Sequence, residues 1–384
     1  MKKIVRITTV PLSLEKLLEH QLQFMNNFYQ VTAVSSEGER LHKFGIQEGV
    51  KTFELGLTRK ITPWQDIKAV WKLYRFLKKE QPFIVHSHTP KAGIVGMLAA
   101  KLAGVPHRLH TVAGLPLLEA KGFKRTILEK VEQLTYACAT KIYPNSKGLK
   151  TIILEEKFCS ATKIKVLGNG SSNGINTTYF NVNHFSNEML SEHREKLGIE
   201  KNDFVFVFVG RLVGDKGINE LINSFYAIAK ENVATKLLLV GPFEDDLDPL
   251  NSETKKILSE HKQIIAVGYQ QDVRPFLAIS NSLVFPSYRE GFPNVVMQAG
   301  AMGLPAIVSD INGCNEIISH EENGLIVAVK SEVAVCEAMR RMLNDKQLYK
   351  HLQLNARNAI TSRFEQQVIW KALLNEYQSL EHVS

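Results

Sequence analysis

Residues 288–305 read Tyr-Arg-Glu-Gly-Phe-Pro-Asn-Val-Val-Met-Gln-Ala-Gly-Ala-Met-Gly-Leu-Pro, and this stretch decides the fold. The short apolar run before it, at 283–286, predicts a buried strand. Apolar residues with helical spacing follow it, with Pro293 at the expected first helical position. Glu290 is therefore expected on a glycine-containing loop between the carboxyl end of a strand and the amino end of a helix. Free backbone N–H groups at such a helix end suit hydroxyl and phosphate oxygens.

The same alternation of apolar strands and amphipathic helices extends over almost the whole chain. In the first half, strands are predicted at 4–9, 30–35, 52–55, 83–87, 108–112, 141–144 and 164–167. After a polar stretch at 181–188, the pattern restarts with strands at 204–209, 236–240, 264–267, 283–285 and 306–308. This repetition predicts an α/β protein with two doubly wound parallel sheets. Ligands of such sheets bind beyond the carboxyl ends of the strands, so functional residues are expected in the loops that follow strands.

A second motif, Gly-Arg-Leu-Val-Gly-Asp-Lys-Gly at 210–217, directly follows the predicted strand 204–209. Gly210 lets the chain turn closely at the end of that strand. The guanidinium of Arg211 and the ammonium of Lys216 could then grip a diphosphate. A solvated basic turn is the alternative interpretation of this octapeptide taken alone.

Together the two motifs resemble the donor-sugar site of the GT-B glycosyltransferases, specifically the large retaining group often called family 4. That family carries a Gly-Arg-Leu…Lys-Gly segment and, downstream, a Glu followed by Gly-Phe-Pro or a similar sequence. The resemblance implies the GT-B fold, in which two Rossmann-like domains face a cleft. It implies an acceptor-binding domain over residues 1–185 and a nucleotide-sugar donor-binding domain over 186–364. A C-terminal helix, 365–384, is expected to pack back on the first domain.

The resemblance also implies roles for single residues. Arg211 and Lys216 would bind the donor pyrophosphate, Glu290 would bind donor-sugar hydroxyls, and the segments at 240–242 and 268–273 would flank the nucleotide base. The other substrate-binding residues that it implies in the second half are Gly210, Gly268, Tyr269, Gly291, Phe292, Pro293, Asn294 and Gln298. The alternative interpretation of Glu290 is an acid that caps the following helix, which would explain the Glu but not the Gly-Phe-Pro-Asn sequence after it.

Gln298 departs from the family pattern. It stands where members usually have a Glu that contacts the nucleotide ribose. An amide keeps one acceptor oxygen and adds two donors, so it can still bind a ribose diol. The charge-assisted part of that hydrogen bond, about 1–2 kcal/mol, is lost.

Two histidine-containing segments follow strands in the first half, His-Ser-His-Thr-Pro at 86–90 and His-Thr-Val-Ala-Gly at 110–114. The spacing of His86 and His88 would suit a metal only with a third ligand nearby, and none is spaced for that role. Histidines at such a strand end are also commonly structural. In the family, a His in the place of His110 reaches the donor sugar near the reacting carbon. His110 is therefore assigned with Glu290 to the catalytic centre, and His88 to substrate binding beside it.

The charge is unevenly distributed. Residues 1–185 contain 27 Lys and Arg against 13 Asp and Glu, whereas the remainder contains 20 against 26. Such an asymmetry predicts an anionic partner for the first half. No interleaved aromatic-basic motif supports nucleic acid, so an anionic membrane surface is favoured. Segments 58–79 and 121–130 mix aromatic and basic residues, as expected either of an interfacial helix or of an ordinary amphipathic helix packed on the sheet.

The bulk sequence restricts the location. The sequence contains no run of about 18 apolar residues, the length that could span a membrane. The N-terminus lacks a signal-peptide core. The four cysteines have neither metal-ligand nor disulfide spacing. A cytoplasmic protein, peripheral on the inner face of the cytoplasmic membrane, is expected.

Within the family, the sequence looks closest to bacterial enzymes of capsule, O-antigen and lipid-linked oligosaccharide assembly. The resemblance implies retaining transfer of a sugar from a nucleotide diphosphate donor, expected to be UDP-linked, to a polyprenyl-diphosphate-linked saccharide. No Asp-x-Asp cluster stands where a metal would bridge the diphosphate, so neither a metal nor a cofactor is expected. A GT-B-fold sugar-nucleotide epimerase and a non-catalytic sugar-nucleotide-binding protein remain the alternatives.

Overall fold

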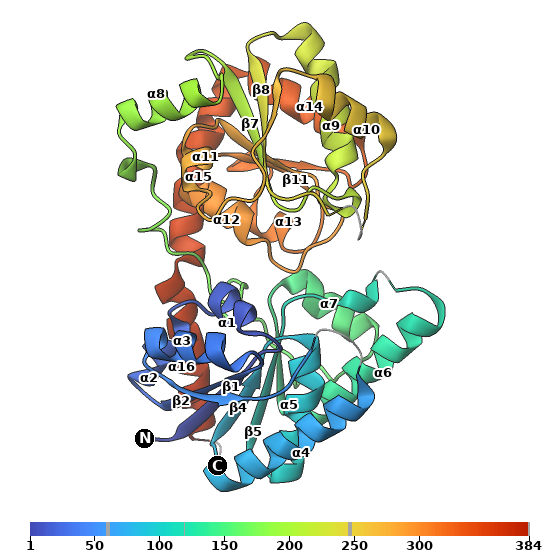
Figure 1. The fold of residues 1–384 in the computed structure, drawn as a ribbon, viewed down its shortest axis with the longest axis vertical. Coiled ribbons are helices and arrows are strands. Elements are labelled where there is room, and N and C mark those ends of the chain that lie inside the picture. The colour runs from blue at the N-terminus through green and yellow to red at the C-terminus, as the bar shows by residue number, and fades with distance from the viewer. Residues whose placement is uncertain (59–61, 119, 245–247, 383–384) are drawn as a thin grey trace. The chain divides into compact units, whose positions relative to one another are not determined.

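Two units, each built on a six-stranded parallel sheet, make up the chain (Figure 1). The computed structural model describes residues 1–58, 62–118, 120–244 and 248–382. The first unit comprises Met1–Asn173 with Gln367–Ser384, and the second comprises Gly174–Gln366. The two doubly wound sheets expected from the sequence are thus confirmed. The first unit ends at Asn173, before the boundary expected at residue 185, because the segment after Gly174 packs with the second sheet's core.

The sheet of the first unit has the strand order β3-β2-β1-β4-β5-β6. Its strands are β1 (Lys3–Ile7), β2 (Gln30–Ser35), β3 (Lys51–Glu54), β4 (Ile84–Ser87), β5 (His107–Val112) and β6 (Lys141–Pro144). Ile4 of β1 is in register with Val31 of β2 and with Ile84 of β4. The strand expected at 164–167 is absent from the described sheet, where Ile164 forms only an isolated bridge to Ile142.

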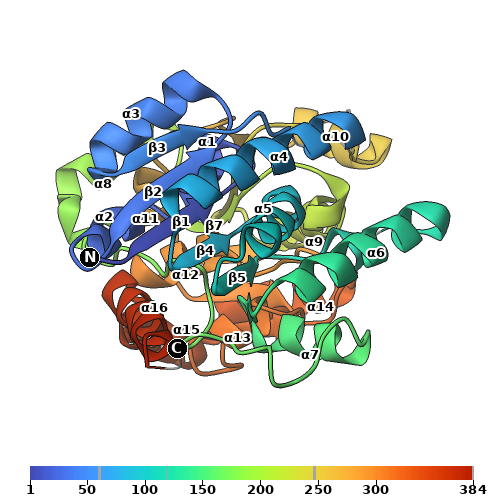
Figure 2. The same cartoon turned by 90° about the horizontal axis from the view of Figure 1, so that it is seen from below.

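Helices cover both faces of this sheet (Figure 2). They are α1 (Pro11–Leu17), α2 (Gln21–Asn26), α3 (Gly38–Glu48), α4 (Pro63–Glu80), α5 (Pro90–Ala103), α6 (Gly122–Cys138), α7 (Lys147–Glu155) and α16 (Gln366–Leu380). Side chains alternate along a strand, so Val5 and Ile7 pack with α4 to α7, whereas Ile4 packs with α1 to α3 and α16.

The C-terminal helix α16 belongs to the first unit through polar as well as apolar contacts. The hydroxyl of Tyr377 lies 2.6 Å from Nδ1 of His86, and the indole N–H of Trp370 donates to Oδ1 of Asn173 over 2.6 Å. Tyr377 is fully buried. The last helix of the chain therefore completes one face of the first sheet.

The sheet of the second unit has the order β12-β11-β10-β7-β8-β9. Its strands are β7 (Phe204–Val209), β8 (Thr235–Val240), β9 (Ile264–Ala266), β10 (Ser282–Phe285), β11 (Ala306–Ser309) and β12 (Gly324–Val327). Its helices are α8 (Asn187–Lys196), α9 (Ile218–Glu231), α10 (Ser252–Glu260), α11 (Arg274–Ala278), α12 (Asn294–Ala301), α13 (Cys314–Ile317), α14 (Glu332–Asn344) and α15 (Lys346–Phe364). The continuous apolar run of β7 fits a parallel strand that helices cover on both faces.

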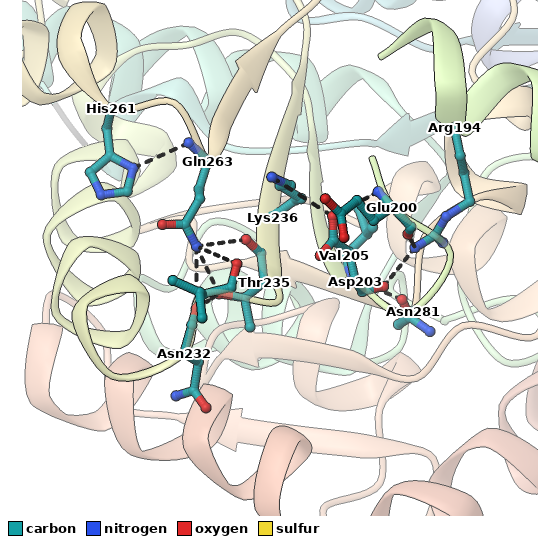
Figure 3. A network of polar contacts seen from close by, with 11 residues as sticks. Arg194, Glu200, Asp203, Val205, Asn232, Thr235, Lys236, His261, Gln263 and Asn281 are labelled. Carbon is teal, nitrogen blue, oxygen red and sulfur yellow. Dashed lines mark hydrogen bonds and ion pairs between the residues drawn. The ribbon is translucent and has the colours of Figure 1, made fainter. Parts of the chain in front are cut away.

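A polar network closes the amino ends of β7 and β8 (Figure 3). Arg194 of α8 donates to the carbonyl oxygens of Asp203, over 2.6 Å, and Ile279, over 2.7 Å. On β8, the carbonyl of Thr235 accepts from the side-chain amide of Gln263 over 2.9 Å. Backbone groups that the ladder leaves unpaired are thus satisfied, and the opposite, carboxyl edge carries the loops with the predicted site residues.

Candidate active site

Three loops of the second unit meet at the carboxyl ends of the neighbouring strands β7, β8 and β9. Gly210 follows β7 and Gly241 follows β8, and a Cβ built on Gly241 would lie 1.7 Å from the carbonyl oxygen of Gly210. Only glycine permits this approach. The amide of Gly241 donates to the carbonyl of Gly268, after β9, over 2.9 Å. Tyr269, the next residue, is 70% exposed.

Lys216 and Glu290 form an ion pair between the loops after β7 and β10. Lys216 ends a single 3-10 turn, Gly214–Lys216, and the side chains of the pair are only 14% and 18% exposed. Oε1 of Glu290 also accepts from the hydroxyl of Ser287 over 3.1 Å. Gly217, with φ of 69°, makes this approach possible, because a Cβ there would lie 2.1 Å from the carbonyl oxygen of Pro286.

Arg211 pairs with a carboxylate that the sequence analysis did not single out. Its Nη1 lies 2.9 Å from Oε2 of Glu244, in the loop after β8. The hydrogen bond that Arg211 donates to the Glu244 carboxylate is the largest effect raising the pKa of Arg211. Nearby, Arg289 pairs with Asp215 at 2.6 Å. The basic groups of this edge are thus interleaved with carboxylates.

The segment after Glu290 is held by packing. Phe292 is buried, with its ring centroid 5.4 Å from that of Phe364. The prediction for Pro293 was wrong by one position, because α12 begins at Asn294 and Pro293 is the residue before it. Among the described residues the Glu290 carboxylate makes no hydrogen bond to an amide of α12, so the interpretation of Glu290 as a capping acid is wrong as well. The Glu290 carboxylate bonds instead to Lys216 and Ser287.

The exposed part of this segment lies around the first turn of α12. Asn294 is exposed and Gln298, one turn later, is half-buried. The carbonyl of Glu290 accepts from the side-chain amide of Asn312. Gly313 approaches closely here, since a Cβ on it would lie 2.6 Å from the carbonyl oxygen of Gly291. The loops after β10 and β11 therefore support each other.

The two histidines predicted for the site lie in the first unit, at the carboxyl ends of β4 and β5. His110 is 3% exposed, and its Nδ1 lies 2.8 Å from the hydroxyl of Ser87. Burial lowers the pKa of His110 to about 4, so the ring is neutral at pH 7. Gly93 of α5 leaves room for the ring, because a Cβ there would lie 2.6 Å from its Cε1.

His88 bonds to a buried arginine. Nε of Arg6 lies 3.1 Å from Nε2 of His88, and Nη2 of Arg6 donates to Oε1 of Gln21 over 2.6 Å. A guanidinium only donates, so Nε2 accepts and the ring proton of His88 lies on Nδ1. Arg6 has no exposed surface and His88 is 2% exposed. Sequence reasoning missed Arg6, whose only signal is a charge inside an apolar strand.

Comparison with known proteins identifies the family. The family model "Glycosyl transferases group 1" matches residues 190–359, and the model "Glycosyl transferase 4-like domain" matches residues 22–170. The capsular polysaccharide biosynthesis glycosyltransferase CapM of Staphylococcus aureus is 34% identical over 379 residues, which cover 98% of this chain and 97% of CapM. The chain belongs to the group 1 glycosyltransferases. The family expected from the Arg211 and Glu290 motifs, and the enzyme class with it, are confirmed.

Two other relatives act on lipid-linked sugars. The Escherichia coli UDP-Gal:alpha-D-GlcNAc-diphosphoundecaprenol alpha-1,3-galactosyltransferase is 29% identical over 371 residues, 94% of this glycosyltransferase and 93% of the relative. The N,N'-diacetylbacillosaminyl-diphospho-undecaprenol alpha-1,3-N-acetylgalactosaminyltransferase of Campylobacter jejuni is 27% identical over 332 residues, 83% and 82% of the two chains.

Solved structures agree on the fold. HepE of Anabaena in complex with UDP superposes with a TM-score of 0.81 at 17% identity, covering 99% of this glycosyltransferase and 100% of HepE. WaaG, a glycosyltransferase involved in lipopolysaccharide biosynthesis, gives a TM-score of 0.71 at 14% identity, covering 96% and 98% of the two chains. The GT-B fold expected from the sequence is confirmed.

Proposed function

We propose that this glycosyltransferase transfers a sugar from a UDP-linked donor to a hydroxyl of a polyprenyl-diphosphate-linked saccharide, with retention at the donor carbon, in bacterial surface glycan assembly. The E. coli relative, by its name, uses UDP-Gal and a diphosphoundecaprenol-linked sugar, and the C. jejuni relative acts on a diphospho-undecaprenol-linked sugar. CapM serves capsular polysaccharide biosynthesis. In this proposal the second unit binds the donor and the first binds the acceptor.

The observation that carries the proposal is the Lys216–Glu290 pair beside Arg211, on neighbouring loops at the carboxyl edge of the second sheet. Two cations there can stabilise the charge that develops on a departing diphosphate, without a metal or cofactor. The Glu290 carboxylate can accept hydrogen bonds from donor-sugar hydroxyls. The backbone amides at the start of α12 can donate hydrogen bonds to oxygens of the donor. Gln298, one turn into α12, would contact the ribose.

The transfer step proposed for this site is the front-face attack that the family resemblance implies. The acceptor hydroxyl attacks the donor carbon on the face from which the diphosphate departs, and the departing phosphate oxygen takes the hydroxyl proton. The carbon–oxygen bond to UDP breaks as the new glycosidic bond forms. His110, a neutral ring at pH 7, would hydrogen-bond the donor sugar near the reacting carbon, with His88 beside it.

The test is an assay of the purified protein with UDP-Gal, UDP-Glc, UDP-GlcNAc and UDP-GalNAc. An N-acetylhexosaminyl-diphospho-undecaprenol would serve as acceptor. UDP release that depends on the acceptor, with an α-linked product by NMR, supports the proposal. Release of an epimerised sugar nucleotide favours the epimerase instead. Binding of UDP-sugars without any release, with or without acceptor, favours a non-catalytic binding protein.

The proposal includes attachment to the inner face of the cytoplasmic membrane. No helix among the described residues is long and apolar enough to cross a bilayer. One side of α4 is buried through Ala69, Leu73 and Leu77. The opposite side exposes aromatic and aliphatic groups among basic ones, and we call it the α4 surface: Trp64, Ile67, Lys68, Trp71, Lys72, Arg75 and Lys79.

The exposure of this surface supports the interfacial interpretation of segment 58–79, of which residues 59–61 lie outside the described residues. Trp64 is 81% exposed and Trp71 62%, so neither packs on the sheet. Phe76, by contrast, stacks on Phe53 of β3, with ring centroids 4.0 Å apart. On α6, Phe123 is 82% exposed. Exposed tryptophans among lysines fit an anionic lipid interface, and the vesicle experiment in the Discussion tests this attachment.

A further inference from the structure

The segment that follows β8 is hydrogen-bonded to the Arg211 loop at both of its ends. The amide of Leu212 donates to the carbonyl of Pro242 over 2.8 Å. Further along, the amide of Asp215 donates to Oδ2 of Asp248 over 2.6 Å. A Cβ on Gly214 would lie 2.9 Å from the same carboxylate, so the two chains are in close contact there. Residues 245–247 lie outside the described residues.

These hydrogen bonds bring Glu244 into contact with Arg211. Glu244 lies two residues after Pro242, and its Oε2 lies 2.9 Å from Nη1 of Arg211. An isolated surface ion pair is held by two mobile side chains. Here the backbone bond between Leu212 and Pro242 already brings the two residues to the same place. The Arg211–Glu244 contact is therefore a feature of how these loops pack.

In the described structure, each cationic side chain of this cluster pairs with a carboxylate. Arg211 pairs with Glu244, Lys216 with Glu290, and Arg289 with Asp215. A fourth carboxylate, Asp248, adjoins them. A diphosphate that binds Arg211 competes with the Glu244 carboxylate for the Nη1 group, and the two anions repel each other while both are near it.

Glu244 differs from the other carboxylates of the cluster in what else it binds. Glu290 also bonds to Ser287, and Asp248 bonds to the backbone of Asp215. Within residues 1–58, 62–118, 120–244 and 248–382, the side chain of Glu244 hydrogen-bonds to Arg211 alone. Its removal therefore changes the charge at Arg211 with little effect on the rest of the loop.

We propose that Glu244 is a positioning residue that holds Arg211 while the site is empty and exchanges with the diphosphate when a nucleotide binds. This inference rests on the proposed function. By retaking Arg211, the carboxylate favours departure of the nucleoside diphosphate product. It thereby weakens product inhibition at the same site that binds the donor.

Titration calorimetry on the wild type and on Glu244→Gln, with UDP, inorganic diphosphate and uridine as probes, tests the proposal. The variant should bind UDP and inorganic diphosphate about fivefold more tightly, the factor expected for one exposed charge interaction. Uridine carries no phosphate, so its affinity should stay unchanged. The inhibition constant for UDP in turnover should fall by the same factor. Glu244→Asp, which keeps the charge, should remain closer to the wild type.

A matched control is Glu231→Gln, which breaks the exposed Arg340–Glu231 pair of 2.7 Å elsewhere in the second unit and should leave all three affinities unchanged. Equal or weaker binding of both phosphate probes by Glu244→Gln would overturn the role of Glu244. If the wild type still bound UDP in that case, the proposed donor would stand. Conversely, if Glu244→Gln bound inorganic diphosphate more tightly but neither protein bound UDP, the role of Glu244 would be supported and the UDP donor rejected.

Discussion

Lys216 and Glu290 lie 74 residues apart in the sequence and form an ion pair within the second unit. Each follows a strand, and the two strands, β7 and β10, are neighbours, with Ser282 in register with Phe206. Parallel neighbours end at the same edge of a sheet, so loops distant in the sequence meet there. The pair thus unites the two motifs that define the proposed donor site.

Removing either cation of the proposed diphosphate clamp should impair turnover. Arg211→Ala and Lys216→Ala should each lose about 2–4 kcal/mol of transition-state stabilisation, because leaving-group charge develops beside both groups. The ratio of kcat/KM between wild type and variant measures this loss. Arg340→Ala, which alters an exposed pair away from the site, is the control. Activity within a few-fold of wild type for both variants would refute the clamp.

Gln298 should contribute to ribose binding. Gln298→Glu restores a carboxylate acceptor, so UDP should bind more tightly by about 1–2 kcal/mol, the value of a charge-assisted hydrogen bond. A nucleotide without ribose hydroxyls, 2′,3′-dideoxy-UDP, should gain nothing from the substitution. Calorimetry with both nucleotides checks the prediction, and an equal gain for the two would place Gln298 away from the ribose.

Turnover should not require a divalent metal ion. Arg211 and Lys216 would supply the positive charge that Mg²⁺ or Mn²⁺ provides in metal-dependent transferases. The rate of UDP release in excess EDTA should therefore equal the rate in untreated buffer. Complete loss with chelator, restored by an added divalent ion, would contradict this prediction.

The α4 surface should bind anionic vesicles. Each Lys or Arg near an anionic leaflet contributes about 1 kcal/mol, and the attraction falls off within a Debye length of about 8 Å. Co-sedimentation should occur with anionic but not neutral vesicles and should fade as salt rises. Combined reversal to Glu at Lys68, Lys72 and Lys79 should weaken it more than reversal at Lys124 and Lys130 of α6. Identical binding to both vesicle types at low salt would refute the electrostatic attachment.

The buried carboxyl of Glu132, on α6, should make stability depend on pH. Burial raises its pKa from 4.5 to about 7, so the folded protein keeps a proton that the unfolded chain releases. The stability linked to this proton is fully present below pH 4.5 and is lost as the pH rises through 7, by about 3 kcal/mol in total. Between pH 5 and pH 8, the free energy of unfolding should therefore fall by about 3 kcal/mol less in Glu132→Gln than in the wild type.

Urea unfolding of wild type and Glu132→Gln at the two pH values measures the difference. Glu129→Gln, on the same helix and closer to solvent, controls for removal of an acidic group from α6. An identical pH dependence in wild type and Glu132→Gln would show that the buried carboxyl does not titrate in this range.

Most strands could be predicted from their apolar runs, including short ones such as β6, predicted and observed at 141–144. β7 occupies the predicted residues 204–209, because six consecutive apolar residues have no alternative to burial. β12 was missed, since the Gly324 that begins it is also typical of a turn. The run at 164–167 has strand composition, yet only Ile164 reaches the edge of the sheet.

The positions of the site residues could likewise be predicted only in part from the sequence. The positions of Arg211 and Glu290 could be predicted because both lie in loops that follow strands, and strand ends are placed by the sheet. Glu244 and Arg6 could not, because their positions depend on how loops pack and on partners such as His88, 82 residues from Arg6. Periodicity carries no information on such contacts.

The position of α16 also bears on the order in which the protein is made. The second unit is one continuous segment, Gly174–Gln366, whereas the first needs the residues after Gln367 to cover one face of its sheet. A ribosome releases those residues after the whole of the second unit. Domains usually fold in the order of synthesis, but here we expect the second unit to reach its final packing before the first. Until Tyr377 arrives, the side of the first sheet around His86 stays open to water and to chaperones.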